Sequence, residues 1–440
     1  MTAFLRRRLK HIADVRFSNV DKLAEAGEAP VRLCNYTDVY NNERIDAAMP
    51  FMTATATTAE IRRFRLHVGD VILTKDSESP TDIAVPAVVA STAADLVCGY
   101  HLAMVRPRRG VLLGRYLQRA LQADGIRQQF YLSANGVTRF GLSQDAIGNA
   151  LVPVPPLRNQ EVIADFLDMR TLAIDALIDK QEQLLRLLAE KRQVVITQAV
   201  TKGLDLSVPM KDSGVDWVGP CPAGWLRVRV SYVADVCNGS TPDRNNDAYW
   251  VNGDIPWLSS GKVNDFIVNE ATEFITARAL RETSVRMLRK GTVLVGLVGQ
   301  GRTRGMSAIM GIEACINQNV AGVSARKQVM DGFLHLLFVA AYESLRELGR
   351  GGQQDALNCE IIKAFRVPLP PLAEQGRIVA HVHEALRRMD GLVHNVEAQV
   401  EKLREYRQAL ITAAVTGKLD ISVAPSAPRV ASRQPEAARA

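Results

Sequence analysis

Residues 152–160 read Val-Pro-Val-Pro-Pro-Leu-Arg-Asn-Gln, and residues 367–375 read Val-Pro-Leu-Pro-Pro-Leu-Ala-Glu-Gln. Each copy precedes a long segment that ends on a matching tail, Ile-Thr-Gln-Ala-Val-Thr at 196–201 and Ile-Thr-Ala-Ala-Val-Thr at 411–416. When 152–206 is aligned without gaps to 367–421, about 21 of the 55 pairs are identical, which is far above chance for an arbitrary register. A repeat spacing of 215 residues is too long for a solenoid unit, so the sequence indicates a duplicated half-protein.

The repeated motif predicts the start of a long helix. Two consecutive prolines keep the chain extended and remove two amide donors, so the helix cannot begin before them. Neither proline nor glycine occurs between Arg158 and Lys202, which predicts an uninterrupted first helix. Apolar residues recur at coiled-coil spacing in both copies, so the two helices are predicted to pack against each other. The main positions are Ile163, Leu167, Ile174, Leu177, Leu184 and Leu188 in the first copy, and Ile378, Val382, Met389, Leu392, Leu403 and Leu410 in the second.

Two globular blocks, residues 1–151 and 229–366, accompany the helical segments 152–206 and 367–421. Short strand-like runs mixed with turns, and one helical pattern over 112–129, favour an α+β fold. The blocks repeat each other loosely: residues 66–73 are similar to 288–295, and Leu142 and Ile147 correspond to Leu357 and Ile362. We therefore expect one scaffold with different loops. Residues 207–228 are predicted to be a linker and 422–440 a disordered tail.

The composition says little about which molecules this chain binds. The chain has 440 residues and a net charge of +7, which favours a polyanionic partner without establishing one. Its six cysteines are scattered, without the spacing of a metal site or a disulfide framework. No apolar run is long enough to span a bilayer, and no secretory signal opens the chain. The sequence therefore predicts a cytoplasmic protein with no membrane partner.

The sequence contains no recognisable catalytic constellation. The glycines at 296, 299, 301 and 305 lack the lysine and hydroxyl of a phosphate-binding loop. His381 and His383 are two residues apart on a predicted helix, so they face different sides and cannot hold one metal together. The Asp-Pro-Pro-Tyr-type tetrapeptide with which amino-methyltransferases hold the exocyclic amine is also missing. We expect a binding protein without catalytic or metal-ligating residues.

The Pro-Pro-Leu-x-x-Gln helix start, the Ile-Thr-x-Ala-Val-Thr tail and the duplicated blocks together resemble the specificity subunit of type I restriction-modification systems. The resemblance covers residues 1–421 and is supported by Gly-Ser-Thr-Pro at 239–242, Ile-Pro-Trp-Leu-Ser at 255–259 and Asp-Ser-Gly-Val-Asp-Trp at 212–217. The first copy departs from the family with Arg-Asn-Gln at 158–160, and the first block lacks the Gly-Ser-Thr-Pro loop. A loop-by-loop correspondence is therefore not carried over to the first block.

The resemblance implies two α/β target recognition domains separated by two long antiparallel coiled-coil helices, with pseudo-twofold symmetry. Each domain would read one half of a bipartite site in double-stranded DNA. The helices would dock two methyltransferase subunits, and restriction (motor-nuclease) subunits would join them. The complex would be a DNA adenine methyltransferase and endonuclease, with S-adenosylmethionine, ATP and Mg on the partner subunits and no cofactor on this chain.

Polar loops after predicted strands are the candidates for DNA contact, because base edges are read mainly by Arg, Asn and Gln side chains and phosphates are held by Lys, Arg and Ser. The second block offers Gln300, Arg302, Thr303 and Arg304, then Asn317, Gln318 and Asn319, and also Ser259, Ser260 and Lys262. The first block offers Asn35, Tyr36 and Thr37, and Lys75 and Ser77. The alternative for each loop is an ordinary solvated turn. Arg106, Arg108, Arg109, Arg115 and Arg119 fit a phosphate-binding face or a solvated helix start equally well.

Two other functions fit the sequence. One is a stand-alone duplicated DNA-binding regulator, which needs no partner subunits. The other is a coiled-coil scaffold that binds only protein. Neighbouring genes for a methyltransferase and a helicase-nuclease would distinguish the three hypotheses.

Overall fold

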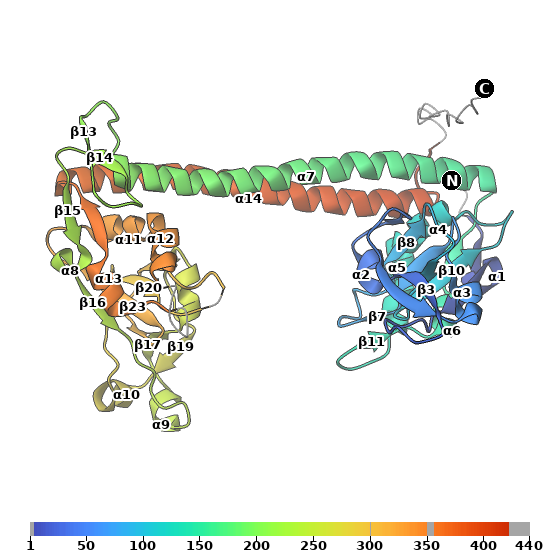
Figure 1. The fold of residues 1–440 in the computed structure, drawn as a ribbon, viewed down its shortest axis with the longest axis horizontal. Coiled ribbons are helices and arrows are strands. Elements are labelled where there is room, and N and C mark those ends of the chain that lie inside the picture. Colours follow the sequence, from blue (N-terminus) through green and yellow to red (C-terminus); the bar gives the residue numbers. More distant parts are fainter. Residues whose placement is uncertain (1–3, 300, 350–355, 422–440) are drawn as a thin grey trace. The chain divides into compact units, whose positions relative to one another are not determined.

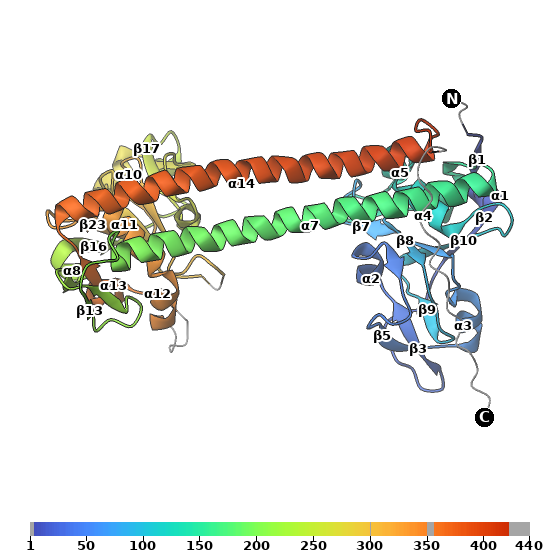
Figure 2. The ribbon, with the colours of Figure 1, turned by 90° about the horizontal axis from the view of Figure 1, so that it is seen from above.

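The computed structural model describes residues 4–299, 301–349 and 356–421. The chain divides into two compact units, Met1–Glu182 with Glu397–Ala440, and Gln183–Val396. Each unit combines one globular block with one half of each long helix (Figures 1 and 2). The predicted tail 422–440 and the candidate Gln300 lie outside the described residues.

The first unit is built on a five-stranded sheet. Its strands lie in the order β2 (Ala13–Phe17), β10 (Leu102–Pro107), β6 (Val71–Thr74), β8 (Pro86–Val89), β4 (Arg44–Ile45). A three-stranded sheet has the order β5 (Met52–Ala56), β3 (Ala29–Cys34), β9 (Leu96–Cys98). Two further pairs are β1 (Arg6–Arg8) with β12 (Leu151–Pro153), and β7 (Asp76–Ser77) with β11 (Phe140–Gly141).

The helices of this block are α1 (Leu9–Ile12), α2 (Tyr36–Tyr40), α3 (Thr58–Phe64), α4 (Gly114–Gln122), α5 (Asp124–Ser133) and α6 (Gln144–Asn149). The single helix predicted over 112–129 is two helices. Ala123 is extended (φ −69°, ψ 136°) and buried between them. The amide of Asp124, freed by this break, donates to Oγ1 of Thr412 at 3.1 Å. A contact that is distant in the sequence therefore accompanies the break.

The second unit repeats the same strand orders. Its five-stranded sheet is β16 (Ala234–Asn238), β23 (Val320–Ala325), β20 (Val293–Gly296), β21 (Ser307–Met310), β18 (Ile267–Val268), and its three-stranded sheet is β19 (Glu273–Ile275), β17 (Ile255–Leu258), β22 (Cys315–Ile316). The helices are α8 (Val230–Val233), α9 (Asp247–Trp250), η1 (Ser260–Asn264), α10 (Ala277–Glu282), α11 (Asp331–Ala340), α12 (Tyr342–Leu348) and α13 (Cys359–Ala364). The identical order shows that the duplication extends to the blocks.

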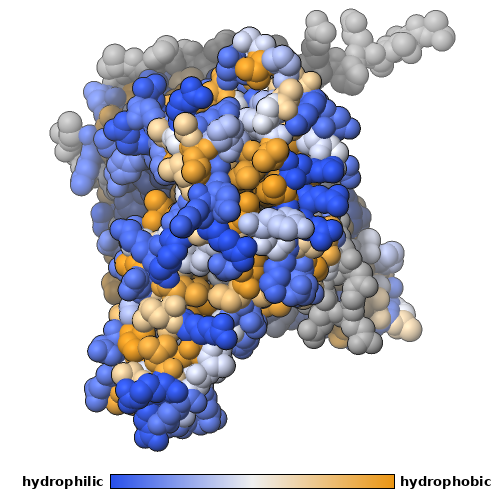
Figure 3. All heavy atoms as spheres, turned by 90° about the vertical axis from the view of Figure 1, so that its left-hand side faces the viewer, coloured by the Kyte–Doolittle hydropathy of each residue, from blue (hydrophilic) through white to orange (hydrophobic). Residues whose placement is uncertain are grey.

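The segment 207–228, predicted as a linker, carries strands of its own. β13 (Met210–Asp212) pairs with β14 (Pro220–Pro222), and β15 (Leu226–Arg229) pairs with β24 (Arg366–Leu369). Trp225 is 2% exposed within the core of the second unit. On the face that carries β13–β15 and α8, hydrophobic residues occur in small patches separated by hydrophilic ones (Figure 3).

Both faces of each central sheet are buried, which explains why its strands are almost wholly apolar. Val71 and Leu73 pack with α4 and the long helices, whereas Ile72 between them packs toward the three-stranded sheet. In the second unit Val293 and Val295 face the helices and Leu294 faces the other way. This alternation follows the period of two of a strand. Each unit is therefore a layer of helices, a central sheet and a smaller sheet.

The two long helices are α7 (Leu157–Lys202) and α14 (Leu372–Val415), each beginning directly after the proline pair. They run antiparallel, and in the first unit Arg407 pairs with Asp175 at 2.7 Å. In the second unit Arg192 pairs with Asp390, and these two residues occupy the same positions of the repeat. The predicted α+β class and the packing of two long helices are confirmed.

The apolar positions of these helices differ in their surroundings. Ile163, Leu167, Ile174, Ile378, Val382, Met389 and Leu410 are buried, Leu188 and Leu403 are half-buried, and Leu177, Leu184 and Leu392 are exposed. An α-helix drifts by about 20° per heptad relative to a strict 3.5-residue repeat, so one straight seam cannot keep every position inside. The exposed leucines are free to contact a partner.

A buried glutamine joins each helix start to the block beside it. Gln375 is fully buried; its Nε2 donates to the carbonyl oxygens of Pro370 (2.9 Å) and Gln328 (3.1 Å), and its Oε1 accepts from the amide of Met330 (2.8 Å). Gln160 makes the same three bonds in the first unit, to Pro155, Val111 and Leu113. The glutamine that ends the Pro-Pro-Leu-x-x-Gln motif thus provides hydrogen-bond partners for backbone groups of the loop before α4 in the first unit and of the loop before α11 in the second.

One of the three differences between the two motifs, Asn159 in place of Glu374, has a structural cause. Glu374 accepts a hydrogen bond from the indole nitrogen of Trp225 at 3.1 Å, beside Gly203. At the corresponding place in the first unit the phenyl ring of Phe4 lies against Gly417. Phenylalanine has no donor, so Asn159 stands where the second copy needs a carboxylate.

The tail of each repeat packs in the unit that its own helix start does not join. Ile196, Ala199 and Val200, which end the first copy, belong to the core of the second unit. Ile411 and Val415, which end the second copy, belong to the core of the first unit. Each core therefore needs both helices.

Another buried group of the second unit is a histidine. His335 of α11 is 1% exposed, with its Nε2 3.4 Å from the carbonyl oxygen of Ser307 and its ring 4.6 Å from that of Phe266. Burial lowers the pKa of His335 to about 4, against an ordinary value of 6.5, although the Ser307 carbonyl opposes the shift. The imidazole is therefore neutral in the folded protein at neutral pH.

We expect Gln375→Leu to destabilise the second unit by roughly 2–4 kcal/mol, because it leaves one buried amide and two buried carbonyl groups without partners. All four tryptophans lie in this unit, so tryptophan fluorescence during urea unfolding reports on it. Gln198→Leu, at an exposed position of α7, is the control. Equal urea midpoints for the two variants would contradict the role of Gln375.

We expect the second unit to lose stability as the pH falls from 6.5 toward 4, because His335 takes up a proton in the unfolded chain and not in the folded one. Between pH 6.5 and 5 the loss should be about 2 kcal/mol. His335→Gln should remove this part of the pH dependence, as seen by tryptophan fluorescence, and the exposed-site variant His394→Gln should retain it. An unchanged pH dependence in His335→Gln would contradict the assignment.

Candidate nucleic-acid interface

The two principal candidate loops occupy the same place in the two units. The β6–β8 loop (residues 75–85) and the β20–β21 loop (residues 297–306) each follow the middle strand of a central sheet. Near their ends Ala84 (φ 59°) and Gly305 (φ 80°) share a left-handed backbone. Their amides donate to the carbonyl oxygens of Thr74 and Gly296, each at 2.9 Å. The scaffold holds both loops in the same way, although their sequences differ.

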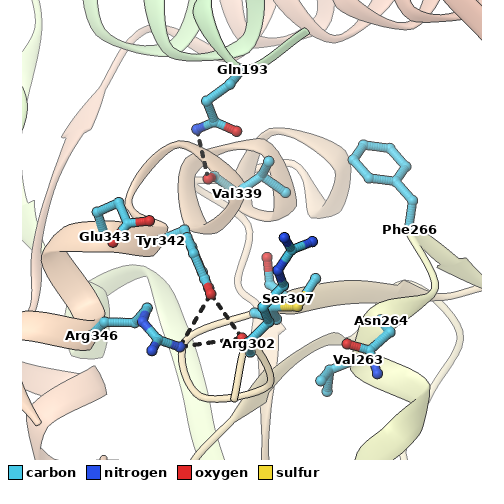
Figure 4. A pocket seen from close by; sticks show the side chains of 11 residues that line it. Gln193, Val263, Asn264, Phe266, Arg302, Ser307, Val339, Tyr342, Glu343 and Arg346 are labelled. Carbon is cyan, nitrogen blue, oxygen red and sulfur yellow. Dashed lines mark hydrogen bonds between the residues drawn. The ribbon is translucent and has the colours of Figure 1, made fainter. Parts of the chain in front are cut away.

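Helix α12 positions the β20–β21 loop. Nη1 of Arg346 donates to the carbonyl oxygens of Gly301 (2.9 Å) and Arg304 (3.1 Å). The hydroxyl of Tyr342 donates to the carbonyl oxygen of Arg302 at 2.9 Å (Figure 4). The loop backbone is therefore turned toward α12 and held by charge-assisted bonds.

A pocket of about 650 Å³ lies beside this loop. Its walls come from the loop, α11, α12, η1 and α7, and its lining includes Gln193, Phe266, Arg302, Ser307 and Glu343 (Figure 4). Nε2 of Gln193 donates to the carbonyl oxygen of Val339 at 3.1 Å, which ties the long helix to α11. The hydroxyl of Ser307 is buried and has no partner within the described residues. The pocket thus mixes aromatic, amide and charged groups.

The structure places the arginines of the β20–β21 loop differently. Arg302 is exposed, and Thr303 is half-buried. Arg304 is only 5% exposed, because its backbone is held inward by Arg346. Arg302 is therefore the more exposed of the two arginines of this loop.

The other candidates of the second unit have mixed surroundings. Asn317 is buried, and its Oδ1 accepts from the amide of Asn319 at 3.1 Å, which shapes the turn before β23. Gln318 is exposed and accepts from the hydroxyl of Thr241 in the Gly-Ser-Thr-Pro loop. Lys262 pairs with Asp265 at 3.2 Å, and Ser259 and Ser260 are half-buried at the start of η1. The bond between Thr241 and Gln318 therefore joins the Gly-Ser-Thr-Pro loop at 239–242 to the candidate loop at 317–319.

In the first unit two of the candidates, Lys75 and Tyr36, lie near carboxylates. Lys75 donates to Asp76 at 3.1 Å, and His101 lies 2.8 Å from the same carboxylate. Burial opposes ionisation of Asp76, but the bonds from His101 and Lys75 outweigh it and lower the pKa of Asp76. Ser77 is buried, Asn35 and Tyr36 are half-buried, and Thr37 is exposed.

The second carboxylate of this group is Asp82. The rings of Tyr36 and Tyr40 stack with centroids 5.5 Å apart, and the hydroxyl of Tyr40 donates to Asp82 at 2.8 Å. Burial, and the charge of Asp82, raise the pKa of Tyr36, so its hydroxyl remains a donor at neutral pH. Stacked aromatic rings beside hydroxyl donors are suited to contact with a planar, polar ligand.

The arginines at the end of β10 and beyond it serve mainly internal contacts. Arg106 pairs with the buried Asp70 at 2.7 Å, Arg115 with Asp168 at 2.6 Å, and Arg119 with Asp168 at 2.9 Å. Arg108 and Arg109 are exposed. Three of the five predicted cations are therefore held in ion pairs: Arg106 within the block, and Arg115 and Arg119 to Asp168 of α7.

Sequence reasoning missed the residues that hold the helices to the blocks. Gln408 donates to the carbonyl oxygen of Gln122 at 2.7 Å, as Gln193 does to Val339 in the second unit. Arg407 also reaches Glu43 at 2.6 Å, whereas its equivalent Arg192 lies 5.1 Å from the ring of Phe266. Both residues are identical in the two copies, and this identity at polar positions was the available signal.

No group of three His, Cys, Asp or Glu side chains able to hold a metal ion occurs in the part of the chain that the structure describes. Among the same residues, no helix is both long and apolar enough to cross a membrane.

Comparison with known proteins gives consistent relatives. A family model described as the type I restriction modification DNA specificity domain matches residues 222–402. A putative type I restriction enzyme specificity subunit, MjaX, of Methanocaldococcus jannaschii is 22% identical over 368 residues, which cover 82% of this chain and 81% of that protein. The EcoBI specificity subunit of Escherichia coli is 25% identical over 314 residues, 66% of this chain and 64% of that protein.

Solved structures share the fold. A chain from a structure that addresses complex assembly and conformational transition of a type I system aligns with a TM-score of 0.67 and 19% identity, covering 95% of this chain and 99% of that chain. The HsdS subunit of Thermoanaerobacter tengcongensis aligns with a TM-score of 0.51 and 18% identity, covering 95% of this chain and 97% of that chain. Residues 222–402 thus match the specificity-domain family, and the chain as a whole is similar in sequence and fold to specificity subunits of type I restriction-modification systems.

Proposed function

We propose that each unit of this chain reads one half of a bipartite DNA site on behalf of a type I restriction-modification complex. The observation that carries the proposal is the pair of equivalent loops. Two copies of one scaffold present different side chains at the same end of the same sheet, which suits two different half-sequences. The relatives reported above are named as specificity subunits, which supports a role for this chain as the non-catalytic, sequence-reading member of such a complex. A stand-alone regulator and a protein-only scaffold find no support among them.

The loops supply groups that suit DNA. In the second unit Arg302 can approach a phosphate or the acceptor edge of guanine, and Gln318 offers an amide. In the first unit Thr37 is exposed, the rings of Tyr36 and Tyr40 stack, and the hydroxyl of Tyr40 donates to Asp82. Arg346 and Tyr342 keep the backbone of the β20–β21 loop in place, so its side chains need little reordering on binding.

The partners follow from the family. We propose that methyltransferase subunits dock on the long helices, two per chain because the helices are duplicated, and that restriction subunits join this core. S-adenosylmethionine, ATP and Mg would be bound by those subunits and not by this chain. The complex would act in the cytoplasm, where its DNA is. A multi-angle light-scattering mass of the co-purified core tests the two-to-one ratio.

We expect Arg302→Ala, in a complex with the methyltransferase subunit, to relax only the half-site read by the second unit. The loss should be about 1–3 kcal/mol if Arg302 contacts a base edge. A phosphate contact would instead weaken all sequences alike and reduce the salt dependence of binding. Sequencing of methylated genomic DNA, with binding measured at several salt concentrations, separates the two.

Lys290→Ala provides the matched control, since this exposed cation lies before β20, at the end of the strand opposite the loop. Its methylation motif and affinity should stay unchanged. If Arg302→Ala behaves like Lys290→Ala, the loop takes no part in recognition.

A further inference from the structure

Two pockets occupy equivalent places in the two units. The pocket of about 650 Å³ in the second unit lies between the β20–β21 loop, α12 and α7. In the first unit a pocket of about 190 Å³ lies between the β6–β8 loop and α14. Gln193 lines the larger pocket, and its equivalent in the repeat, Gln408, lines the smaller one. The first unit is therefore an internal reference for the larger pocket.

One difference between the pockets is an aromatic ring in place of a carboxylate. In the first unit the amide of Val88 donates to the carbonyl oxygen of Glu43 at 3.0 Å. In the second unit the amide of Ile309 makes the same bond to Phe266 at 3.2 Å, so Phe266 is the equivalent of Glu43. Glu43 pairs with Arg407 at 2.6 Å, whereas Phe266 has no charge and borders the larger pocket.

A second difference is a buried hydroxyl. Ser307 begins β21 opposite Val295, as Pro86 begins β8 opposite Leu73, so the first unit has no hydroxyl at this position. Ser307 is 8% exposed and lines the larger pocket, and its Oγ has no hydrogen-bond partner in the part of the chain that the structure describes. Buried hydroxyl groups of folded proteins nearly always have a partner. The Ser307 hydroxyl is therefore available to a ligand in the pocket.

The charges that line the larger pocket favour an anion. Arg302 and Arg346 are opposed there by Glu343 alone among the described residues. Nη1 of Arg346 is occupied by carbonyl oxygens of the β20–β21 loop, whereas the guanidinium group of Arg302 points into the pocket (Figure 4). A guanidinium group matches the geometry of a phosphate or a carboxylate. We therefore expect an anionic group of the ligand beside Arg302.

The remaining walls favour a planar ring. Phe266, Met306 and Val263 contribute apolar surface, and Asn264 adds an amide. Aromatic rings stack with an offset on one another, and a methionine sulfur also packs well against a ring. A volume of about 650 Å³ lies within the range of roughly 300–1,000 Å³ that is typical of small-molecule sites.

We propose that the pocket of the second unit binds a nucleotide. Its base stacks on Phe266, the edge of the base bonds to the hydroxyl of Ser307, and its phosphate bonds to Arg302. The first unit binds none, because Glu43 and Pro86 replace the ring and the hydroxyl. The nucleotide is either free in solution or part of the bound DNA strand. Only the second of these sources rests on the function proposed above.

The test is a calorimetric titration of the full chain with each of the four deoxynucleoside 5′-monophosphates. We expect at least one of them to bind, with one equivalent per chain. Phe266→Glu introduces the residue of the first unit, which can pair with Arg192 as Glu43 pairs with Arg407. It should weaken binding about tenfold or more, because it removes the stacking surface. Phe274→Glu is the matched control, since Phe274 is 42% exposed in the same unit and lies outside the pocket lining, and it should bind normally.

Ser307→Ala separates a ligand contact from a structural role. It should weaken nucleotide binding about three- to tenfold, because one hydrogen bond to the base is lost. The urea midpoint, followed by tryptophan fluorescence, should stay the same or rise, because the hydroxyl has no partner in the described protein to lose. A lower midpoint with unchanged affinity would contradict the role of Ser307.

Phe266→Leu distinguishes the two sources, because it removes the ring without adding charge. If the nucleotide is free, this variant should bind duplex DNA that carries the methylated motif as tightly as the unchanged chain. If the DNA strand supplies the nucleotide, the monophosphates should not bind, and Phe266→Leu should weaken duplex binding about tenfold. Neither effect, with duplex binding intact, would overturn the pocket assignment and leave the proposed function standing. Failure of the unchanged chain, with its methyltransferase subunit, to bind the duplex would instead overturn the proposed function, and the titration with monophosphates would still decide whether the pocket binds a free nucleotide.

Discussion

The architecture depends on one buried amide that occurs twice. Gln160 and Gln375 each bond three backbone groups, one of which belongs to the proline segment and two to the loop before α4 or α11. A buried amide whose hydrogen bonds are all made fixes both the distance and the orientation of the segments it joins. Each bond that is lost would leave a buried backbone group without a partner. The start of each long helix is thereby held to its block at a defined angle, and the loops after β6 and β20 are presented from a rigid support.

Each unit also contains residues from both copies of the repeated helical segment. The tail of the first copy completes the core of the second unit, and the tail of the second copy completes the core of the first. Arg407 and Arg192 then connect the helices to the blocks through different partners, a carboxylate in one unit and an aromatic ring in the other. Shared backbone geometry with divergent side chains is therefore found both at these anchors and at the candidate loops after β6 and β20.

The sequence predicted the features that periodicity and repetition control. Paired prolines marked where α7 and α14 begin, and the register of the repeat paired Leu142 and Ile147 with Leu357 and Ile362, all of which are buried in the structure. It could not place side chains whose neighbours are distant in the chain. Arg304 is drawn inward because Arg346, more than forty residues away, holds its carbonyl group. Arg115 and Arg119 are engaged by Asp168 on a helix that composition alone cannot orient. Loops without a periodic pattern carry no signal for such contacts. The burial and the partners of the candidate side chains could therefore not be predicted from the sequence.

The most direct test of the account is the motif methylated in cells that express this chain with its methyltransferase subunit. Two equivalent scaffolds with different loops predict a bipartite motif, with two unrelated specified halves separated by a stretch of fixed length in which any base is accepted. A single continuous motif, or one in which only one half is specified, would contradict the claim that both units read DNA.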